Sequence, residues 1–159
     1  MPISTIGTAG LETAGVSQIK LATGVAGTGP AFSAYQSSAQ SVTSSTFTKI
    51  LFATEDFDTN SNFASSTFTP TVAGYYQINA AVLPSTATTQ TVLSLYKNGT
   101  AFKTVSSNSI NASGSVSSLI YLNGSTDYVE TYVYIVGTAP ALFAQAQYTW
   151  FNGAMVRGA

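Results

Sequence analysis

The sequence predicts one antiparallel all-β domain, because three features of the chain agree. From Pro30 onward, short runs of β-branched and aromatic residues alternate with turn residues every roughly 8–12 residues, a spacing typical of sandwiches and barrels. Helical periodicity is absent. Only 7% of the residues are charged, against about 25% in an average domain, and Ser, Thr, Asn, Gln and Gly replace them, which favours strands and turns.

Strands are expected where the apolar runs are clearest, with turns between them. The expected strands are Phe47 to Ala53, Tyr75 to Leu83, Thr91 to Lys97, Val116 to Leu122, Tyr128 to Val136 and Ala146 to Met155. The expected turns are Asp58-Thr59-Asn60-Ser61, Ala73-Gly74, Asn98-Gly99, Asn123-Gly124 and Gly137, since these residue types tolerate positive φ. The sequons that begin at Asn98, Asn111 and Asn123 are interpreted as such turns and loops rather than as glycosylation sites.

Residues 1–29 are expected to form a leader separate from a head domain at residues 30–159. The leader is rich in Gly, Ala and Thr, and it buries too little by itself to offset the entropy of ordering the chain. It is either flexible or ordered against a partner, and its apolar side chains favour the second possibility. The expected attachment residues are Ile3, Leu11, Val16, Ile19 and Leu21.

The segment Tyr128 to Val136 is apolar on both faces. Val129, Val133 and Ile135 alternate with three tyrosines and so point to one side of the strand. That side can pack in a core, whereas the tyrosine side needs a second cover, which another subunit would supply most simply. A fully central strand in a monomer is the alternative. The predicted subunit interface is Tyr128, Tyr132 and Tyr134.

The order of aromatic and glycine positions resembles the globular head of the complement component 1q family, a member of the tumour necrosis factor-like group. The matching positions are Phe52, Asp58, Phe63, Phe68, Gly74, Tyr76 and Ile78. Four residues rather than the family's six separate Phe63 from Phe68, and Ala80 replaces an aromatic residue. Pro30 to Ala34 resembles the opening strand of the family, and Tyr148 to Val156 resembles its closing strand.

This resemblance implies an antiparallel β-sandwich jelly roll of about ten strands, trimeric, whose exposed loops bind a ligand. The family positions Phe52, Phe68, Gly74, Tyr76 and Ile78 are then residues of the fold core and carry no reactive chemistry. The resemblance names no ligand. The leader in turn looks like the starts of bacteriophage fibre and other virion proteins.

The residue types argue against an enzyme and against nucleic-acid binding. The chain contains neither His nor Cys, so the usual bases, nucleophiles and thiolate ligands are missing. Five basic residues and a net charge of −1 cannot neutralise a row of phosphates. No signal peptide and no 18-residue apolar run is recognisable, which predicts synthesis in a cytoplasm and no membrane insertion.

One acidic cluster offers the oxygen ligands that a hard cation prefers. It comprises Glu55, Asp56 and Asp58, with Asn60 nearby, and could hold calcium. The alternative is a solvated loop without a bound ion. No other cofactor is expected. Paired glycosidase carboxylates are a poorer interpretation, because adjacent carboxylates in a loop rarely flank a sugar-binding cleft.

Together these observations predict a non-enzymatic structural protein on the surface of a bacteriophage particle. It would be a homotrimeric knob, attached to other virion proteins through the leader, that either decorates the capsid or heads a tail fibre that contacts a glycan or protein of the host surface. A non-viral, soluble, lectin-like binding module of the same fold is the alternative, and an enzyme on an all-β scaffold is a third.

Overall fold

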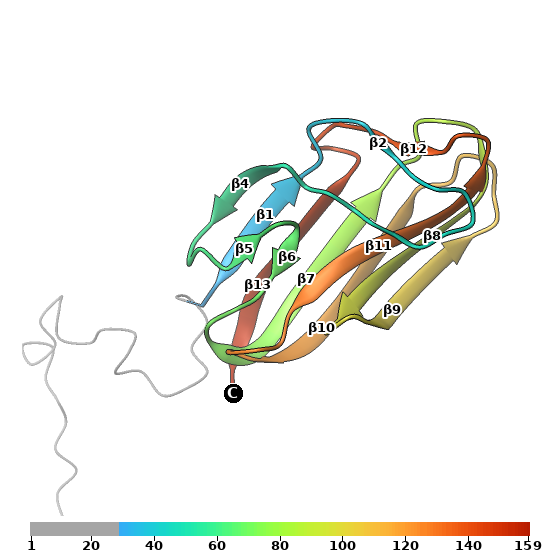
Figure 1. Cartoon of the computed structure of the whole chain (residues 1–159). Helices are drawn as coiled ribbons and strands as arrows, with labels where there is room; N and C mark the ends of the chain where they lie inside the picture. The colour runs from blue at the N-terminus through green and yellow to red at the C-terminus, as the bar shows by residue number, and fades with distance from the viewer. Residues whose placement is uncertain (1–28) are drawn as a thin grey trace, which may run out of the picture.

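The computed structural model describes residues 29–159, which form a two-layered β-sandwich (Figure 1). The five-stranded sheet has the order β10-β7-β13-β1-β4. Its strands are β10 (Gly114–Asn123), β7 (Ala73–Val82), β13 (Trp150–Gly158), β1 (Ala31–Tyr35) and β4 (Thr54–Asp58). Every pairing between them is antiparallel. The first and last described strands, β1 and β13, are therefore neighbours at the middle of this sheet.

The six-stranded sheet covers the other side of the core. Its main order is β5-β6-β11-β8-β9, and β3 also pairs with β11. The strands are β5 (Phe63–Ala64), β6 (Thr67–Phe68), β11 (Val129–Gly137), β8 (Thr88–Lys97), β9 (Thr100–Ser107) and β3 (Thr48–Lys49). A separate small sheet pairs β2 (Gln40–Ser41) with β12 (Ala141–Leu142). In the described part of the chain, no helix is long and apolar enough to cross a membrane.

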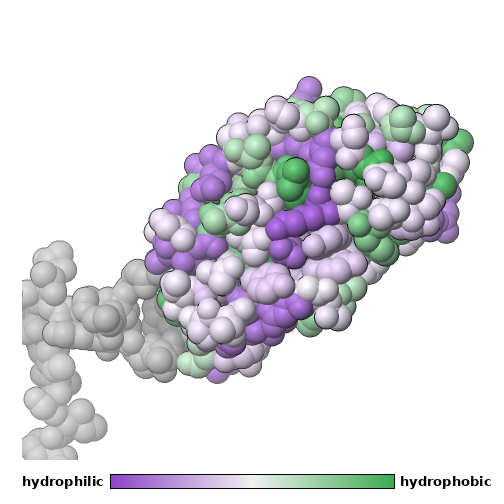
Figure 2. Space-filling view, in the orientation of Figure 1, coloured by the Kyte–Doolittle hydropathy of each residue, from purple (hydrophilic) through white to green (hydrophobic). Residues whose placement is uncertain are grey.

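Neutral polar residues cover much of the outside of the sandwich. Figure 2 shows one face as mostly pale, weakly polar surface, with separate purple and green patches. This is the surface that a chain with 7% charged residues and abundant Ser and Thr must present. Solubility thus depends on hydroxyl and amide groups rather than on charge.

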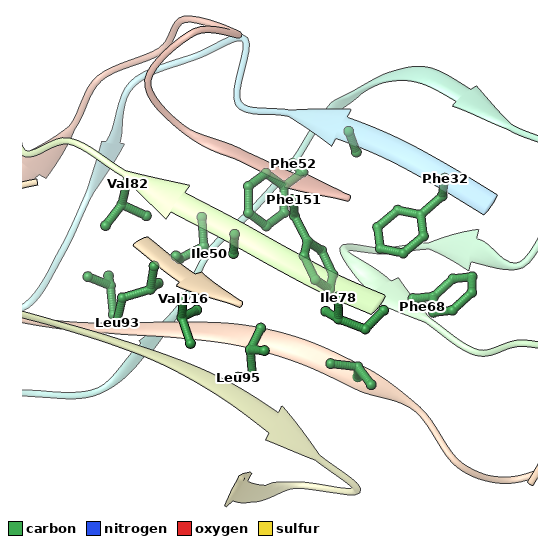
Figure 3. Close-up of a cluster of buried hydrophobic side chains, with 14 of the residues drawn as sticks. Phe32, Ile50, Phe52, Phe68, Ile78, Val82, Leu93, Leu95, Val116 and Phe151 are labelled. Atoms are coloured by element: carbon green, nitrogen blue, oxygen red, sulfur yellow. The ribbon is translucent and has the colours of Figure 1, made fainter. Parts of the chain in front are cut away.

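Alternation along the long strands builds the core. In β7, Tyr76, Ile78, Ala80 and Val82 are fully buried and the residues between them point outward. Figure 3 shows the labelled side chains from both sheets meeting in the space between the layers. Phenylalanines fill one part of this space: the Phe32 and Phe68 ring centroids lie 4.3 Å apart.

The positions that match the complement 1q pattern lie inside this core. Phe52 is 5% exposed, and Phe68, Tyr76 and Ile78 are completely buried. Burial raises the pKa of Tyr76 to about 12, and its hydroxyl donates a hydrogen bond to the Val72 carbonyl oxygen at 2.7 Å. The phenol therefore stays neutral, and its one polar atom is satisfied.

The role of Gly74 differs from the predicted one. The sequence predicts a turn at Ala73-Gly74, but β7 begins at Ala73 and Gly74 already pairs with Gly158 of β13. A Cβ atom at Gly74 would lie 2.5 Å from the Arg157 carbonyl oxygen. Glycine is needed here because the backbone of β13 approaches closely, at the point where its register shifts.

Most predicted strands and turns are confirmed, and the errors are local. Asn98 and Gly99 both have positive φ, 52° and 75°, and turn β8 into β9. Asn111 and Gly124 also have positive φ and lie in turns. Asn123 and Gly137 were predicted in turns but are the last residues of β10 and β11. The predicted strand Phe47 to Ala53 is wrong over most of its length, because only Thr48–Lys49 pairs. Strand β9 was not predicted, and β13 begins at Trp150 rather than at Ala146.

Candidate functional site

The acidic cluster does not form the predicted loop. Glu55, Asp56 and Asp58 lie on β4. Asp56 accepts a hydrogen bond from the Ser33 hydroxyl at 2.8 Å. The Asp58 carboxylate accepts from the backbone N–H of Phe63 at 2.7 Å, which holds the turn that contains Asn60. Within residues 29–159, no three acidic, His or Cys side chains are grouped so that they could hold a metal ion.

The predicted tyrosine interface lies on the outer face of the six-stranded sheet, and the chain itself covers part of it. Tyr132 and Tyr134 are half-buried. The Tyr96 ring packs on Tyr132, with centroids 4.2 Å apart, and the Phe47 ring packs on Tyr134 at 5.4 Å. Tyr128 is also half-buried, at the start of β11. Part of the cover that this face needs therefore comes from the chain itself, and the predicted subunit interface stays a prediction.

An ion pair crosses the same face. The Lys49 ammonium lies 2.6 Å from the Glu130 carboxylate and donates to the Thr67 hydroxyl at 2.7 Å, so it joins β3, β6 and β11. Burial, and then the nearby Glu130 carboxylate, raise the pKa of Tyr132. Aromatic contacts and one ion pair thus join the strands across this face.

The outward face of the five-stranded sheet is more exposed and carries the stronger candidate interaction surface, which we call the sheet face. Its apolar members are Phe57, Tyr75, Leu119 and Tyr121, which are 50%, 40%, 54% and 43% exposed. Tyr75 pairs directly with Tyr121, and their ring centroids lie 5.4 Å apart. Phe57 forms no aromatic pair with another ring in residues 29–159.

A chain of neutral hydrogen bonds runs across the middle of the sheet face. The Gln77 amide donates to the Ser117 hydroxyl at 2.8 Å, that hydroxyl donates to the Asn79 side-chain oxygen at 2.8 Å, and the Asn79 amide donates to Asn152 at 3.0 Å. The four residues come from β10, β7 and β13. These bonds lower the cost of removing water from the groups that form them. Within residues 29–159, the Gln77 side-chain oxygen and the Asn152 side-chain N–H₂ group form no such bond.

A shallow hollow lies beside this chain of hydrogen bonds. It has a volume of about 260 Å³, and its lining includes Phe57, Asn79 and Asn152. Small residues, among them Ala31, Ser33 and Ala154, line the rest. The centre of the sheet face therefore carries neutral polar and small residues, with apolar groups around it, which resembles the buried centre of a subunit interface. Two charged residues border it: Asp56, which bonds to Ser33, and Arg157, which pairs with Tyr75.

A charged cluster joins two turns at one end of the sandwich. Asp127 accepts hydrogen bonds from the Asn98 side-chain amide at 2.7 Å and from the Asn123 backbone N–H at 3.1 Å. The Lys97 ammonium lies 3.0 Å from the Asp127 carboxylate. The hydrogen bond from Asn98 is the main reason why the pKa of Asp127 is lowered, and Lys97 adds to it. The cluster fastens the β8-β9 turn to the β10-β11 turn.

We expect Asp127 to make the free energy of unfolding depend on pH in the acidic range. The pKa of Asp127 is lower in the folded state than in the unfolded state. The Asp127 carboxylate therefore stabilises the fold at pH values above its unfolded-state pKa of about 3.9, and this stabilisation is lost as the pH falls through the folded-state pKa. Asp127→Asn should lower the melting temperature near neutral pH, and the difference from wild type should shrink as the pH falls below about 4. Thermal melts at several pH values measure this.

The exposed Asp56→Asn variant is the matched control, because an asparagine oxygen can still accept from the Ser33 hydroxyl. Near neutral pH it should lower the melting temperature less than Asp127→Asn. A difference between Asp127→Asn and wild type that stays the same from neutral to acid pH would contradict the assigned role of this carboxylate.

The predicted attachment residues Ile3, Leu11, Val16, Ile19 and Leu21 lie outside the described residues. The sheet face was missed by the sequence analysis, which considered two-sided apolarity only for Tyr128 to Val136. A signal was present: Leu119 and Tyr121 alternate with the core residues Ile120 and Leu122 in β10.

Comparison with known proteins supports the fold and no more. No family model matches the chain, and no curated protein matches it in sequence. Among solved structures, murine APRIL at pH 8.0 superposes with a TM-score of 0.64 at 11% identity, over 79% of this chain and 98% of that one. The globular domain of the zebrafish complement 1qA protein superposes with a TM-score of 0.63 at 20% identity, over 82% of this chain and 99% of that one.

The chain therefore has the jelly-roll fold shared by tumour necrosis factor-like proteins and the complement 1q globular head. This confirms the fold class predicted from the sequence. At these identities the likeness describes architecture, and function must be argued from the surface of this chain.

Proposed function

We propose that this protein is a non-enzymatic, homotrimeric binding or structural module whose subunits meet through the sheet face. The observation that carries the proposal is the combination on that face of exposed Leu119 and Phe57 with a centre of neutral side chains that hydrogen-bond to one another. Apolar side chains that are half exposed on one side of a flat sheet are stabilised when a second copy covers them.

The sheet face is a better interface than the tyrosine face predicted from the sequence. On the tyrosine face, Phe47 and Tyr96 already cover the rings, and burying the Lys49–Glu130 pair would cost desolvation. On the sheet face, Leu119 gains the most from cover because it is 54% exposed. A trimer rather than a dimer is the assembly that the resemblance to the complement 1q head implies.

The mass in solution tests this assembly. Light scattering on the full chain should give a particle near three times the 16.5 kDa chain mass. A monomer across the accessible concentration range would overturn the proposal.

We further propose that the trimer stands on the surface of a bacteriophage particle, after synthesis in the host cytoplasm, with residues 1–29 as the attachment segment. The support is compositional: a charge-poor β-rich head follows a leader with spaced apolar residues. A non-viral, lectin-like binding module of the same fold is equally compatible with the head domain. In both candidate functions the jelly roll positions its exposed loops to contact a ligand.

Deletion of residues 1–29 separates these candidates. If the segment is the anchor, the truncated protein should keep its mass and melting temperature but no longer rebind to particles, because the head is already complete from Pro30. Cryo-electron microscopy of purified particles provides the direct readout. Particle binding by the truncated protein would place the anchor in the head instead.

A further inference from the structure

The end of the sandwich opposite to Pro30 and Gly158 contains no charged residue. Four segments meet there, which we call the distal loops: residues 36–47, 83–87, 108–113 and 138–149. Their side chains are mainly Ser, Thr, Asn, Gln and Ala, with a few large apolar residues. Lys97 and Asp127 lie at the other end of the sandwich, whereas Glu55 pairs with Ala34, two residues before the first of the four segments.

The distal loops are held in place by hydrogen bonds to one another. The Ser85 N–H donates to the Ala141 carbonyl at 2.8 Å, and the Phe143 N–H donates to the Leu83 carbonyl at 3.0 Å. The Asn111 side-chain oxygen accepts from the Thr88 N–H at 3.0 Å. Pairing of β2 with β12 adds a small sheet at the same end. Their shape is therefore largely formed before any ligand arrives, which lowers the entropy cost of binding.

Two hollows open between these loops. One has a volume of about 480 Å³, and its lining includes Ile110, Val136 and Thr138. The other has a volume of about 330 Å³ and is lined by Ser85, Asn111 and Phe143, among others. Ala87 lines both hollows, so they are adjacent.

Both apolar side chains and polar groups line the hollows. Ile110 is 77% exposed, the largest exposure of any large apolar side chain in residues 29–159. Phe143 is 36% exposed, and its ring packs against Tyr148 with centroids 5.5 Å apart. Within the described part of the chain, the Ser85 and Thr138 hydroxyls and the Asn111 side-chain N–H₂ group make no hydrogen bond.

We propose that the distal loops bind an uncharged oligosaccharide. A sugar ring presents apolar C–H faces and hydroxyl edges, which match exposed Phe143 and Ile110 beside the neutral donors and acceptors of Ser85, Asn111 and Thr138. The absence of charge removes the electrostatic attraction that phosphorylated, sulfated or sialylated ligands would need. The inference rests on the proposed function, in which the head displays its loops, and it names the class of ligand.

The test measures binding of the full chain to neutral glucose, galactose, mannose and N-acetylhexosamine oligosaccharides, with sulfated and sialylated counterparts as charged probes. We expect binding to at least one neutral probe, unchanged between about 0.1 and 1 M salt because no charges are screened. Phe143→Ala should weaken it at least about fivefold, from the loss of one aromatic contact. Ile110→Asp should also weaken it, and at 77% exposure this change leaves the fold intact.

Phe102→Ala is the matched control, since Phe102 is 42% exposed but lies on β9 near its turn with β8. It should leave sugar binding unchanged. No binding to any neutral probe, binding to charged probes only, or equal effects of Phe143→Ala and Phe102→Ala would each overturn the proposal. Light scattering on the same samples tests the trimer and the sugar site separately. A monomer that binds sugar would contradict only the proposed trimer, and a trimer that binds no sugar would contradict only the proposed sugar site.

Discussion

Phe68→Ala is expected to lower the free energy of unfolding by about 3–5 kcal/mol, which is a large part of the roughly 5–15 kcal/mol that stabilises a typical domain. Phe68 is completely buried on β6. Its ring stacks on Phe32 at 4.3 Å and meets the Tyr76 ring edge-on at 5.5 Å. Truncation would remove these contacts and leave a cavity between the two sheets. Denaturant unfolding measures the loss.

The same substitution at Phe102 is the control. That ring is 42% exposed on β9, so Phe102→Ala should change stability by less than about 0.5 kcal/mol. If Phe68→Ala gives no soluble protein, Phe68→Leu keeps most of the volume and should cost about 1.5 kcal/mol or less, which remains measurable. Equal stabilities of Phe68→Ala and Phe102→Ala would contradict the placement of Phe68 in the core.

The core could be predicted from the sequence because its signals are local. Alternation places Tyr76 and Ile78 on one side of β7, and Val129, Val133 and Ile135 on one side of β11, whatever the partner strands are. The turn at Asn98-Gly99 is equally local, since both residues adopt positive φ. These features need only a few neighbouring residues to be recognised.

The errors arise where tertiary contacts decide the structure. Strand β9 has one inward apolar residue of note, Val105, so its sequence lacks a strand pattern; pairing with β8 defines it. Conversely, Ile50 and Phe52 are apolar and buried, but they reach the core from a connection that makes almost no ladder. Burial alone therefore does not imply a strand.

The polar centre of the sheet face could not be predicted from a linear pattern. Its central hydrogen bonds join Gln77 and Asn79 of β7 to Ser117 of β10 and Asn152 of β13, which are far apart in the chain. Strand order brings them together. In the sequence each one is an ordinary polar residue of a strand. The tyrosines of β11 form a more conspicuous pattern, and the sequence analysis therefore placed the subunit interface on them.

Leu119→Lys is expected to convert the trimer into monomers without unfolding the head. Leu119 is 54% exposed in the isolated subunit, so the subunit itself tolerates the change. In the proposed assembly the side chain is covered by a second copy, and threefold symmetry places three ammonium groups in apolar surroundings. Each buried, unpaired charge costs several kcal/mol, which exceeds what one interface contact contributes. Light scattering and thermal melts on the same sample separate dissociation from unfolding.

Leu51→Lys is a closely matched control, because Leu51 is also 54% exposed but lies between β3 and β4, away from the sheet face. It should remain a trimer. Tyr134→Lys tests the interface predicted from the sequence: Tyr134 packs on Phe47 within the subunit, so this change should reduce the melting temperature and leave the folded protein trimeric. A trimeric Leu119→Lys beside a monomeric, folded Tyr134→Lys would instead assign the subunit contact to the six-stranded sheet, with the sheet face free for another partner.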